Sequence, residues 1–460
     1  MSTTINNQQT IEIHPAIDFT TEKAYLSQKI SSLDGINIYL IRNDNKKTQY
    51  TTRNIEAFNI QLTHTDFSYN QRWSTQNINS FIRKTINPPT KTELFELIKN
   101  KFLHYLEIRD SKIYDLLTIW NIGTYFYRLF NTYPYIYIGG ISQSGKSKLL
   151  MLSSCICFNS VPSANMSTAV LYRLIQNARC SLFIDETEFL SNWRKAGDFR
   201  NILLNGYKKG LDVFRTRSTP EGNFTAERFE VYSPKMIANI SGLDSVLSSR
   251  CIPITLRRSV NRNISNREVN VEDQEWQQIR DKLYLFLMKY WKEIKQSYVD
   301  YENNTDLIGR NYELWKPIFS IVRFFEDSEL EQRVKLLAQQ ISDSSQFDES
   351  EMQEFLLVET LLTYVIKDNY YRLKDLKNLF AEKFESSDWL TERHTGCLLR
   401  RLGFQSTRRM SYGIDFFLKI SEVKMVAQGF GFEVDSVDSE HSVDIIELRE
   451  GNCLDRVEVI

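Results

Sequence analysis

Apolar residues recur along this chain in two spacings, one typical of buried strands and the other of helices. Short apolar runs occupy 135–138, 181–184, 235–240 and 251–256. Around them, apolar residues recur every three or four positions, as on the buried face of a helix. Strands that alternate with helices predict an α/β fold with a parallel sheet at its centre.

The regions that flank this pattern differ from it. Residues 1–30 are polar and are expected to be loosely packed. From Gly35 to His64, β-branched and aromatic clusters alternate with turn residues, which predicts a small strand-rich unit. Segments 92–107 and 112–130 have helical apolar spacing.

The second half of the chain begins with a helical, charged region over 272–340. Residues 352–425 then predict a helix, a short strand, two helices and two strands joined by the turn at 411–413. Between the acidic run at 180–186 and the 235–240 run, segments 212–217 and 227–232 predict a β-hairpin with a long tip. The tail from about 430 is acidic, and we expect it to be disordered.

A glycine-rich turn after the first apolar run carries the clearest chemical signal. Gly140 is followed, after four residues, by Gly145-Lys146-Ser147, the spacing of a loop that wraps a polyphosphate. Lys146 would reach the β- and γ-phosphates, the Ser147 hydroxyl would hold Mg²⁺, and the helix that follows adds its positive end. The residues assigned to the nucleotide are Gly140, Ser144, Gly145, Lys146, Ser147 and Lys148.

A pair of acids follows the second apolar run, about forty residues beyond the loop. A buried parallel strand here would present Asp185 and Glu186 at its carboxyl end. Asp185 would orient Mg²⁺ through water, and Glu186 would polarise the water that attacks the γ-phosphate. The pair therefore predicts ATP hydrolysis in addition to ATP binding.

Composition excludes several other classes of protein. The 460 residues carry a net charge of −1, so any binding of nucleic acid must use local basic patches. The six cysteines contain no CxxC pair, which favours a reducing, cytoplasmic location and gives no zinc signature. The most apolar predicted helix, 113–130, carries Asp115, Asn121 and Arg128, and is too polar to span a bilayer. We therefore expect no membrane association.

The glycine-rich loop is followed by the acidic strand, by Asn239 near the end of the third apolar run and by Arg250 just before the last run. With these features in this order, the chain resembles the AAA+ ATPases. The likeness covers about 90–420 and is greatest to the primase-helicase-like ATPases of phages, plasmids and integrated elements. Its most specific parts are Leu171-Tyr-Arg-Leu-Ile175, Phe199-Arg-Asn-Ile-Leu-Leu-Asn-Gly-Tyr207, Ser248-Ser-Arg-Cys-Ile252 and Gly309-Arg-Asn-Tyr-Glu-Leu-Trp-Lys-Pro317. The implied domains are an N-terminal strand-containing region (1–87), an AAA+ core with a helical lead-in (88–260), a helical lid (261–345), a winged-helix domain (346–428) and an acidic tail (429–460).

The resemblance also implies roles for three residues. Asn239 would be a sensor that bonds the attacking water or the γ-phosphate, and Arg250 would be an arginine finger that reaches a neighbouring subunit's ATP. Arg310 would be a second sensor on the lid. The plainer alternatives are a strand cap for Asn239, a surface ion pair for Arg250 and a lid anchor for Arg310.

Two basic patches predict a DNA partner. The position of the hairpin in this chain resembles that of the hairpin that enters the central pore of the ring in AAA+ helicases. The predicted winged helix, with arginines on its third helix and wing, suits contact with the major groove and the DNA backbone. The residues assigned to DNA are Lys208, Lys209, Arg215 and Arg217 at the hairpin, and Arg393, Arg400, Arg401, Arg408 and Arg409 in the winged helix. The alternatives are a solvated hairpin balanced by Glu221, Glu227 and Glu230, and a winged helix that binds protein.

The leading hypothesis is an oligomeric, Mg²⁺-dependent ATPase, expected to be a hexameric ring, that acts on DNA as a helicase in the replication of a mobile or plasmid-like element. A second hypothesis is an ATP-switched DNA-binding regulator that does not translocate. A protein-remodelling ATPase is a third, less favoured because the hairpin is basic. The first eighty residues show no primase carboxylate cluster, so a primase or another replication protein would be a separate partner.

Overall fold

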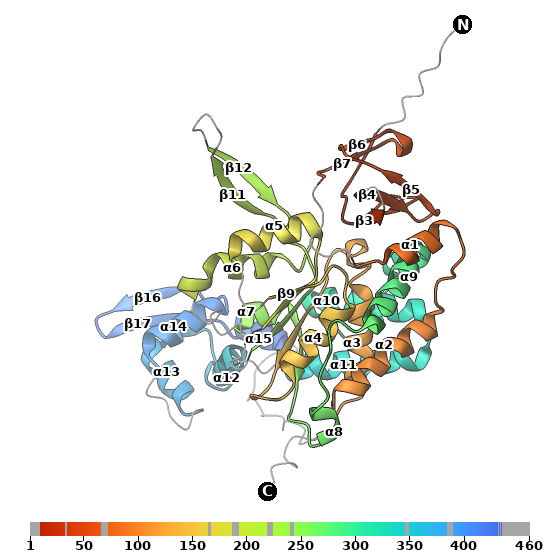
Figure 1. The fold of residues 1–460 in the computed structure, drawn as a ribbon. Coiled ribbons are helices and arrows are strands. Elements are labelled where there is room, and N and C mark those ends of the chain that lie inside the picture. The colour runs from red at the N-terminus through yellow and green to blue at the C-terminus, as the bar shows by residue number, and fades with distance from the viewer. Residues whose placement is uncertain are drawn as a thin grey trace. The chain divides into compact units, whose positions relative to one another are not determined.

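A computed structural model of the chain divides it into two compact units, residues 1–346 and 347–460 (Figure 1). The structure describes residues 10–32, 35–65, 72–163, 167–185, 193–218, 224–239, 243–345, 349–383, 390–430, 432 and 434. The predicted catalytic residue Glu186, the hairpin tip and the acidic tail from 435 lie outside the described residues.

Five parallel strands form the central sheet of the first unit, in the order β14-β8-β13-β10-β9. The strands are β8 (Tyr135–Gly139), β9 (Val161–Ser163), β10 (Leu182–Ile184), β13 (Lys235–Ala238) and β14 (Cys251–Thr255). The predicted α/β fold with a central parallel sheet is confirmed.

Alternate side chains of each strand point to opposite faces of this sheet and enter different cores. Helices cover both faces. Ile136 and Ile138 of β8 enter the larger core, with α3 (Lys112–Gly123), α4 (Lys146–Ile156) and α9 (Gln274–Val299). Tyr135 enters the smaller core, with α5 (Thr168–Ala178), α6 (Trp193–Asn205) and α7 (Ser245–Ser248). The result is a three-layer α/β/α arrangement.

A group of helices extends the larger core. It contains α2 (Lys91–Tyr105), α3, α9, α10 (Gly309–Phe325) and α11 (Ser328–Ser345), which contact one another. Trp120, Trp276 and Trp291 are fully buried there. Two short helices, η2 (Tyr127–Leu129) and α8 (Arg262–Ser265), lie in the connections.

The N-terminal strands begin earlier than the polar sequence predicts. Residues 10–32 are not loosely packed, because Ile13, Ala24 and Leu26 are buried. The strands are β1 (Ile11–Ile13), β2 (Asp18–Phe19), β3 (Ala24–Ser32), β4 (Gly35–Arg42), β5 (Lys46–Gln49), β6 (Asn54–Ile55) and β7 (Ile60–Leu62), in sheets β1-β7-β6 and β2-β3-β4-β5. The turn η1 (Glu56–Phe58) joins β6 to β7, and α1 (Thr75–Ile82) follows.

The predicted hairpin is present as β11 (Val213–Ser218) and β12 (Phe224–Phe229), an antiparallel pair. Figure 1 shows it standing away from the parallel sheet, with α5 and α6 near its base.

The second unit has the predicted order of elements as far as its last strand. The elements are α12 (Glu349–Tyr364), β15 (Asn369–Arg372), α13 (Leu373–Ala381), α14 (Glu392–Arg401), β16 (Thr407–Met410), β17 (Gly413–Leu418) and α15 (Ile420–Gly429). The helix α15, which follows the last strand, was not predicted. The three strands form an antiparallel sheet in the order β15-β17-β16, and Leu376, Leu398 and Phe416 are buried in a separate core. Across the described parts of both units, no helix has the length and apolarity to cross a membrane.

Candidate phosphate-binding site

One edge of the parallel sheet gathers most of the residues that the sequence assigned to nucleotide chemistry. The loop follows β8, Asp185 follows β10, Asn239 follows β13, and 256–259 follows β14. Parallel strands have their carboxyl ends at the same edge, where ligands of open α/β sheets bind. These segments line a cavity of about 620 Å³, within the size range of small-molecule sites.

The backbone of the loop between β8 and α4 turns through positive φ angles. Gly140 has φ of 140°, Gln143 of 63° and Gly145 of 94°. A side chain at Gly140 would place its Cβ 2.3 Å from the Leu256 carbonyl oxygen, so only glycine fits there. Gly145 caps α4 without a side-chain hydrogen bond, which leaves the first N–H groups of the helix directed at the cavity.

Polar side chains of the loop complete a cradle for anionic oxygens. Lys146 Nζ donates to the carbonyl oxygens of Gly140 (2.7 Å) and Ile141 (2.9 Å), and an ammonium has a third N–H to offer. Ser144 Oγ is buried and has no hydrogen-bond partner among the described residues. A buried hydroxyl without a partner is costly, so this atom fits a bound ligand oxygen.

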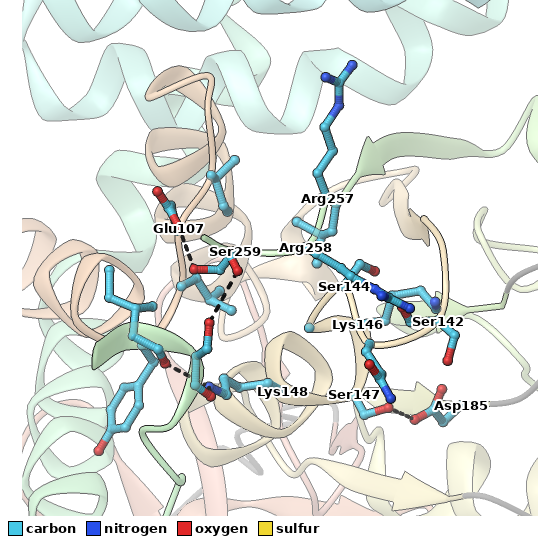
Figure 2. Close-up of a pocket in the computed structure, with 18 of the residues that line it drawn as sticks. Glu107, Ser142, Ser144, Lys146, Ser147, Lys148, Asp185, Arg257, Arg258 and Ser259 are labelled. Atoms are coloured by element: carbon cyan, nitrogen blue, oxygen red, sulfur yellow. Dashed lines mark hydrogen bonds between the residues drawn. The ribbon is translucent and has the colours of Figure 1, made fainter. Parts of the chain in front are cut away.

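A hydroxyl and a carboxylate form the part of the cavity that suits a hard cation. Ser147 Oγ donates to Asp185 Oδ2 at 2.6 Å, as Figure 2 shows. Mg²⁺ prefers such oxygen ligands and is usually held by one or two of them together with substrate phosphates and water. The donor set therefore fits Mg²⁺.

Asn239 lies beside this site and is oriented by a neighbouring strand. Its Oδ1 accepts a hydrogen bond from Tyr137 Oη at 2.8 Å, across the β8–β13 pair. This bond holds the Asn239 side chain at the carboxyl end of β13, where it lines the cavity.

The structure adds two cationic residues and one acidic residue that sequence reasoning missed. Arg257 and Arg258 follow β14 and line the cavity, and Arg258 Nε donates to the Ser142 carbonyl oxygen at 3.0 Å. Figure 2 shows Arg258 lying along the loop, whereas Arg257 extends away from it. Two arginines directly after a predicted strand were a signal that could have been used.

Glu107 gave no such signal, because it lies about 150 residues from its partners. It accepts hydrogen bonds from Ser259 Oγ and from the Asn261 backbone N–H (3.2 Å), which keeps the pKa of this carboxyl below its usual value. Glu107 thereby positions the segment that follows β14 at the rim of the cavity.

Two residues assigned to the nucleotide have other contacts. Lys148 lines the cavity, but its Nζ donates to the carbonyl oxygens of Ile264 and Ser265, both at 3.0 Å. Arg310 does not appear among the cavity-lining residues of the described chain, and its Nη1 donates to Ser249 Oγ at 2.7 Å. Arg250 directly precedes β14, so it lies at the opposite edge of the sheet from the phosphate loop.

The basic residues of the hairpin also have contacts within the chain. Lys208 forms an ion pair with Glu313, and Lys209 Nζ donates to the Arg128 carbonyl oxygen. Burial, aided by the charge of Arg128, lowers the pKa of Lys209 to about 7, so much of its positive charge is lost near neutral pH. Lys209 is therefore less suited to a phosphate contact than a solvated lysine would be.

Arg215 faces the body of the unit. Its guanidinium lies 5.6 Å from the centre of the Tyr172 ring and 3.5 Å from Asp198. The side chain of Arg217 lies outside the described part. The opposite face of the hairpin carries Phe214 and Phe224, which are 61% and 76% exposed.

The arginines of the second unit fall into two groups. Arg401 pairs with Glu354 at 3.0 Å, Arg408 pairs with Asp415 at 3.0 Å and lies over the Tyr370 ring, and Arg400 lies over the Phe416 ring. Arg393 and Arg409 are exposed, and neither forms an ion pair with any residue that the structure describes. These two charges are the ones open to a partner.

Comparison with known proteins gives weak likenesses only. No family model matches the chain, and no curated protein matches it. Two apo structures of the NrS-1 C-terminal region align over 85% of this chain and 96% of their own, with 11% and 12% identity and TM-scores of 0.31 and 0.32. A structure of Drosophila ORC bound to DNA aligns over 76% of this chain and 99% of its own, with 10% identity and a TM-score of 0.22.

Proposed function

We propose that this chain is a Mg²⁺-dependent ATPase of the AAA+ class that works as an oligomer on DNA, as a helicase-like motor. The observation that supports this most is the convergence of Lys146, the Ser147–Asp185 pair, Asn239 and Arg258 on one cavity at the start of α4. A phosphate loop at a helix start, an acid after β10 and a polar side chain after β13, the strand between β8 and β10 in the sheet, are the parts that phosphoryl transfer requires.

Each residue then has a definite task. Lys146 and the α4 N–H groups hold the β- and γ-phosphates, and Arg258 adds positive charge beside the loop. Ser147 and Asp185 would hold Mg²⁺, and the bound ion would supply positive charge for the phosphate oxygens. Asn239 orients the attacking water, and Glu186, directly after Asp185, accepts its proton.

Arg250 completes the reaction from a second copy of the chain. It is at the sheet edge away from its own phosphate loop, so it can reach only the nucleotide of a neighbour. An arginine supplied in this way stabilises the negative charge of the transition state.

The test of the ATPase proposal is Lys146→Ala. We expect it to lower ATP turnover by roughly a thousandfold, because it removes the cation that contacts the reacting phosphate. Lys282→Ala, which removes an exposed lysine paired with Glu93, is the matched control and should turn over like the wild type. Equal turnover by all three proteins would refute the proposal.

DNA is proposed as the partner on two surfaces. The hairpin face with Phe214 and Phe224 offers two exposed rings on which bases of a single strand can stack. The second unit has the helix and hairpin order of a winged helix, with Arg393 on α14 and Arg409 on β16 open to phosphates.

The second unit also supports the alternative of an ATP-switched DNA-binding regulator. Such a protein would bind one duplex sequence and would not displace strands. A forked duplex separates the two functions: ATP-dependent strand displacement supports the motor, whereas sequence-dependent binding without displacement supports the regulator.

A further inference from the structure

Two arginines from distant parts of the chain meet on one hydroxyl at the sheet edge away from the phosphate loop. Arg250 Nη1 lies 3.3 Å from Ser249 Oγ, and Arg310 Nη1 donates to the same oxygen at 2.7 Å. Arg310 lies in the first turn of α10, and Arg250 lies just before β14. The folded chain therefore brings two guanidinium groups side by side.

Their charges are not balanced by acids. Among the described residues, neither Arg250 nor Arg310 has a carboxylate within ion-pair distance. The nearby charges already form pairs of their own, Lys208 with Glu313 and Arg200 with Asp244. Burial and the adjacent Arg310 lower the pKa of Arg250, as expected for like charges held close together.

Arg250 is held rigidly. Its Nε donates to the Leu204 carbonyl oxygen at 2.8 Å, Nη1 donates to the Val246 carbonyl oxygen, and the guanidinium lies 5.3 Å from the centre of the Tyr207 ring. A cation fixed before its ligand arrives loses little entropy on binding, which is the requirement for stabilising charge in a transition state.

Exposed apolar side chains lie next to the two arginines in the sequence. Val246 of α7 is 47% exposed, and Ile308, which caps α10, is 82% exposed. Two guanidinium groups without carboxylate partners attract an anion. This surface therefore suits contact with an anion that a protein partner carries.

Arg310 cannot act as a sensor for the nucleotide of its own chain in this arrangement. It bonds Ser249 at the start of β14, and the cavity lies at the other end of that strand, roughly 16 Å away for five residues. Within the same chain, Arg258 is the arginine that lies along the phosphate loop.

We propose that Arg250 and Arg310 together form a two-arginine site for the terminal phosphate of the nucleotide bound by a second copy of this chain. Nη2 of Arg250 and Nε and Nη2 of Arg310 are the donors that the contacts with described residues leave for phosphate oxygens, and Ser249 sets the spacing of the two side chains. The proposal rests on the proposed ATPase function and assigns Arg310 to the neighbour's active site instead of its own.

Mixed oligomers test the proposal. Arg310→Ala alone should lower turnover by about tenfold or more, as removal of a transition-state arginine does. Mixing it with Lys146→Ala should restore turnover, because the first variant supplies an intact phosphate loop and the second supplies intact arginines. Roughly a quarter of the interfaces in a random equal mixture would be complete. Arg323→Ala, on the same helix, is the control and should behave like the wild type alone.

Recovery in the Arg310→Ala mixture supports the two-arginine site. If mixing with Lys146→Ala restores the turnover of Arg250→Ala but not that of Arg310→Ala, Arg310 is not part of the site. That outcome leaves the ATPase proposal intact. Wild-type protein without ATP turnover refutes the ATPase proposal and this site with it.

A second variant separates chemistry from assembly. Arg310→Lys keeps the charge but loses the planar fork, so it should assemble like the wild type by light scattering and still turn over slowly. Failure of both Arg310 variants to assemble would overturn the proposal, because Arg310 would then be an interface residue only. Loss of fluorescent ATP analogue binding by dilute Arg310→Ala would overturn it too, since the arginine would then act in its own chain.

Discussion

His14 shows how one side chain ties the N-terminal strands to the parallel-sheet region. It is buried, its Nδ1 accepts the Ala16 N–H at 3.1 Å, and its Nε2 donates to the Gln176 carbonyl oxygen at 2.7 Å. This neutral form satisfies both ring nitrogens, and a proton on Nδ1 would remove the acceptor and repel Arg179. Burial, with the charges of Arg179 and His64, holds the pKa of His14 well below 6.5.

A pH dependence of stability follows at this scale. Below about pH 6.5 the unfolded chain takes up a proton at His14 and the folded chain does not, so the free energy of unfolding falls as the pH falls. His14→Gln keeps a donor for Gln176 and does not titrate. We expect its loss of stability between about pH 7.5 and pH 5 to be smaller, by up to about 1.4 kcal/mol per pH unit. Urea unfolding at both pH values measures this. An equal change in the free energy of unfolding in the wild type and in His14→Gln would contradict the prediction.

At the scale of elements, two arginines anchor the carboxyl end of α4, the helix that begins at the phosphate loop. Arg72 donates to the carbonyl oxygens of Ser154 (2.7 Å) and Cys155 (3.0 Å), and Arg280 of α9 donates to Cys155 as well (2.9 Å). The last carbonyl groups of a helix lack partners within the helix and carry partial negative charge. These contacts hold α4 at the end opposite to the candidate phosphate-binding site.

Arg72→Met should therefore destabilise the first unit by about 1–3 kcal/mol, because it removes a charged donor from the carbonyl oxygens of Ser154, Cys155 and Cys157. Arg83→Met, at an exposed arginine after α1, is the control and should change stability by less than about 0.5 kcal/mol. Denaturant unfolding of the full chain compares the two. Equal stability of both variants would show that Arg72 does not anchor the helix.

The β11–β12 hairpin gives a prediction about single strands. Phe214→Ala and Phe224→Ala together should weaken binding of single-stranded DNA by about 2–6 kcal/mol, since stacking contributes about 1–3 kcal/mol per base. Thermal unfolding should change little, because both rings are exposed. Arg228→Ala, on the same face but paired with Asp212, is the comparison variant. Unchanged DNA affinity of the double variant would exclude the stacking role.

At the scale of the whole molecule, the net charge of −1 means that any DNA affinity must come from a few local charges, as proposed for the second unit. Arg393→Ala and Arg409→Ala should each weaken duplex binding about equally across sequences. Each should also reduce the slope of log affinity against log salt by about one. Arg401→Ala should have a smaller effect, because Glu354 already neutralises this arginine. Anisotropy titrations at several salt concentrations measure the slopes. Equal losses of duplex affinity in all three variants would contradict the distinction between the exposed arginines and the paired Arg401.

The sequence alone determined the order of elements and the phosphate loop, because both depend on local properties. Apolar spacing specifies strands and helices wherever one face is buried, and the glycines at 140 and 145 mark a backbone that only glycine adopts easily. The same spacing predicted the hairpin and the order of elements in the second unit. It failed for residues 10–32, where β3 buries the polar side chains of Ser27 and Gln28 beside Ala24, Tyr25 and Leu26.

The tertiary structure alone decided which charged groups are free to act. Glu107 and Arg258 join the cavity, Lys209 is half-buried and donates to the Arg128 carbonyl oxygen, and Arg310 lies with Arg250 at the opposite edge of the sheet. Each outcome depends on contacts between residues that are far apart in the chain. The role of a charge is set by the neighbours that neutralise it or leave it open, and only the folded chain brings those neighbours together.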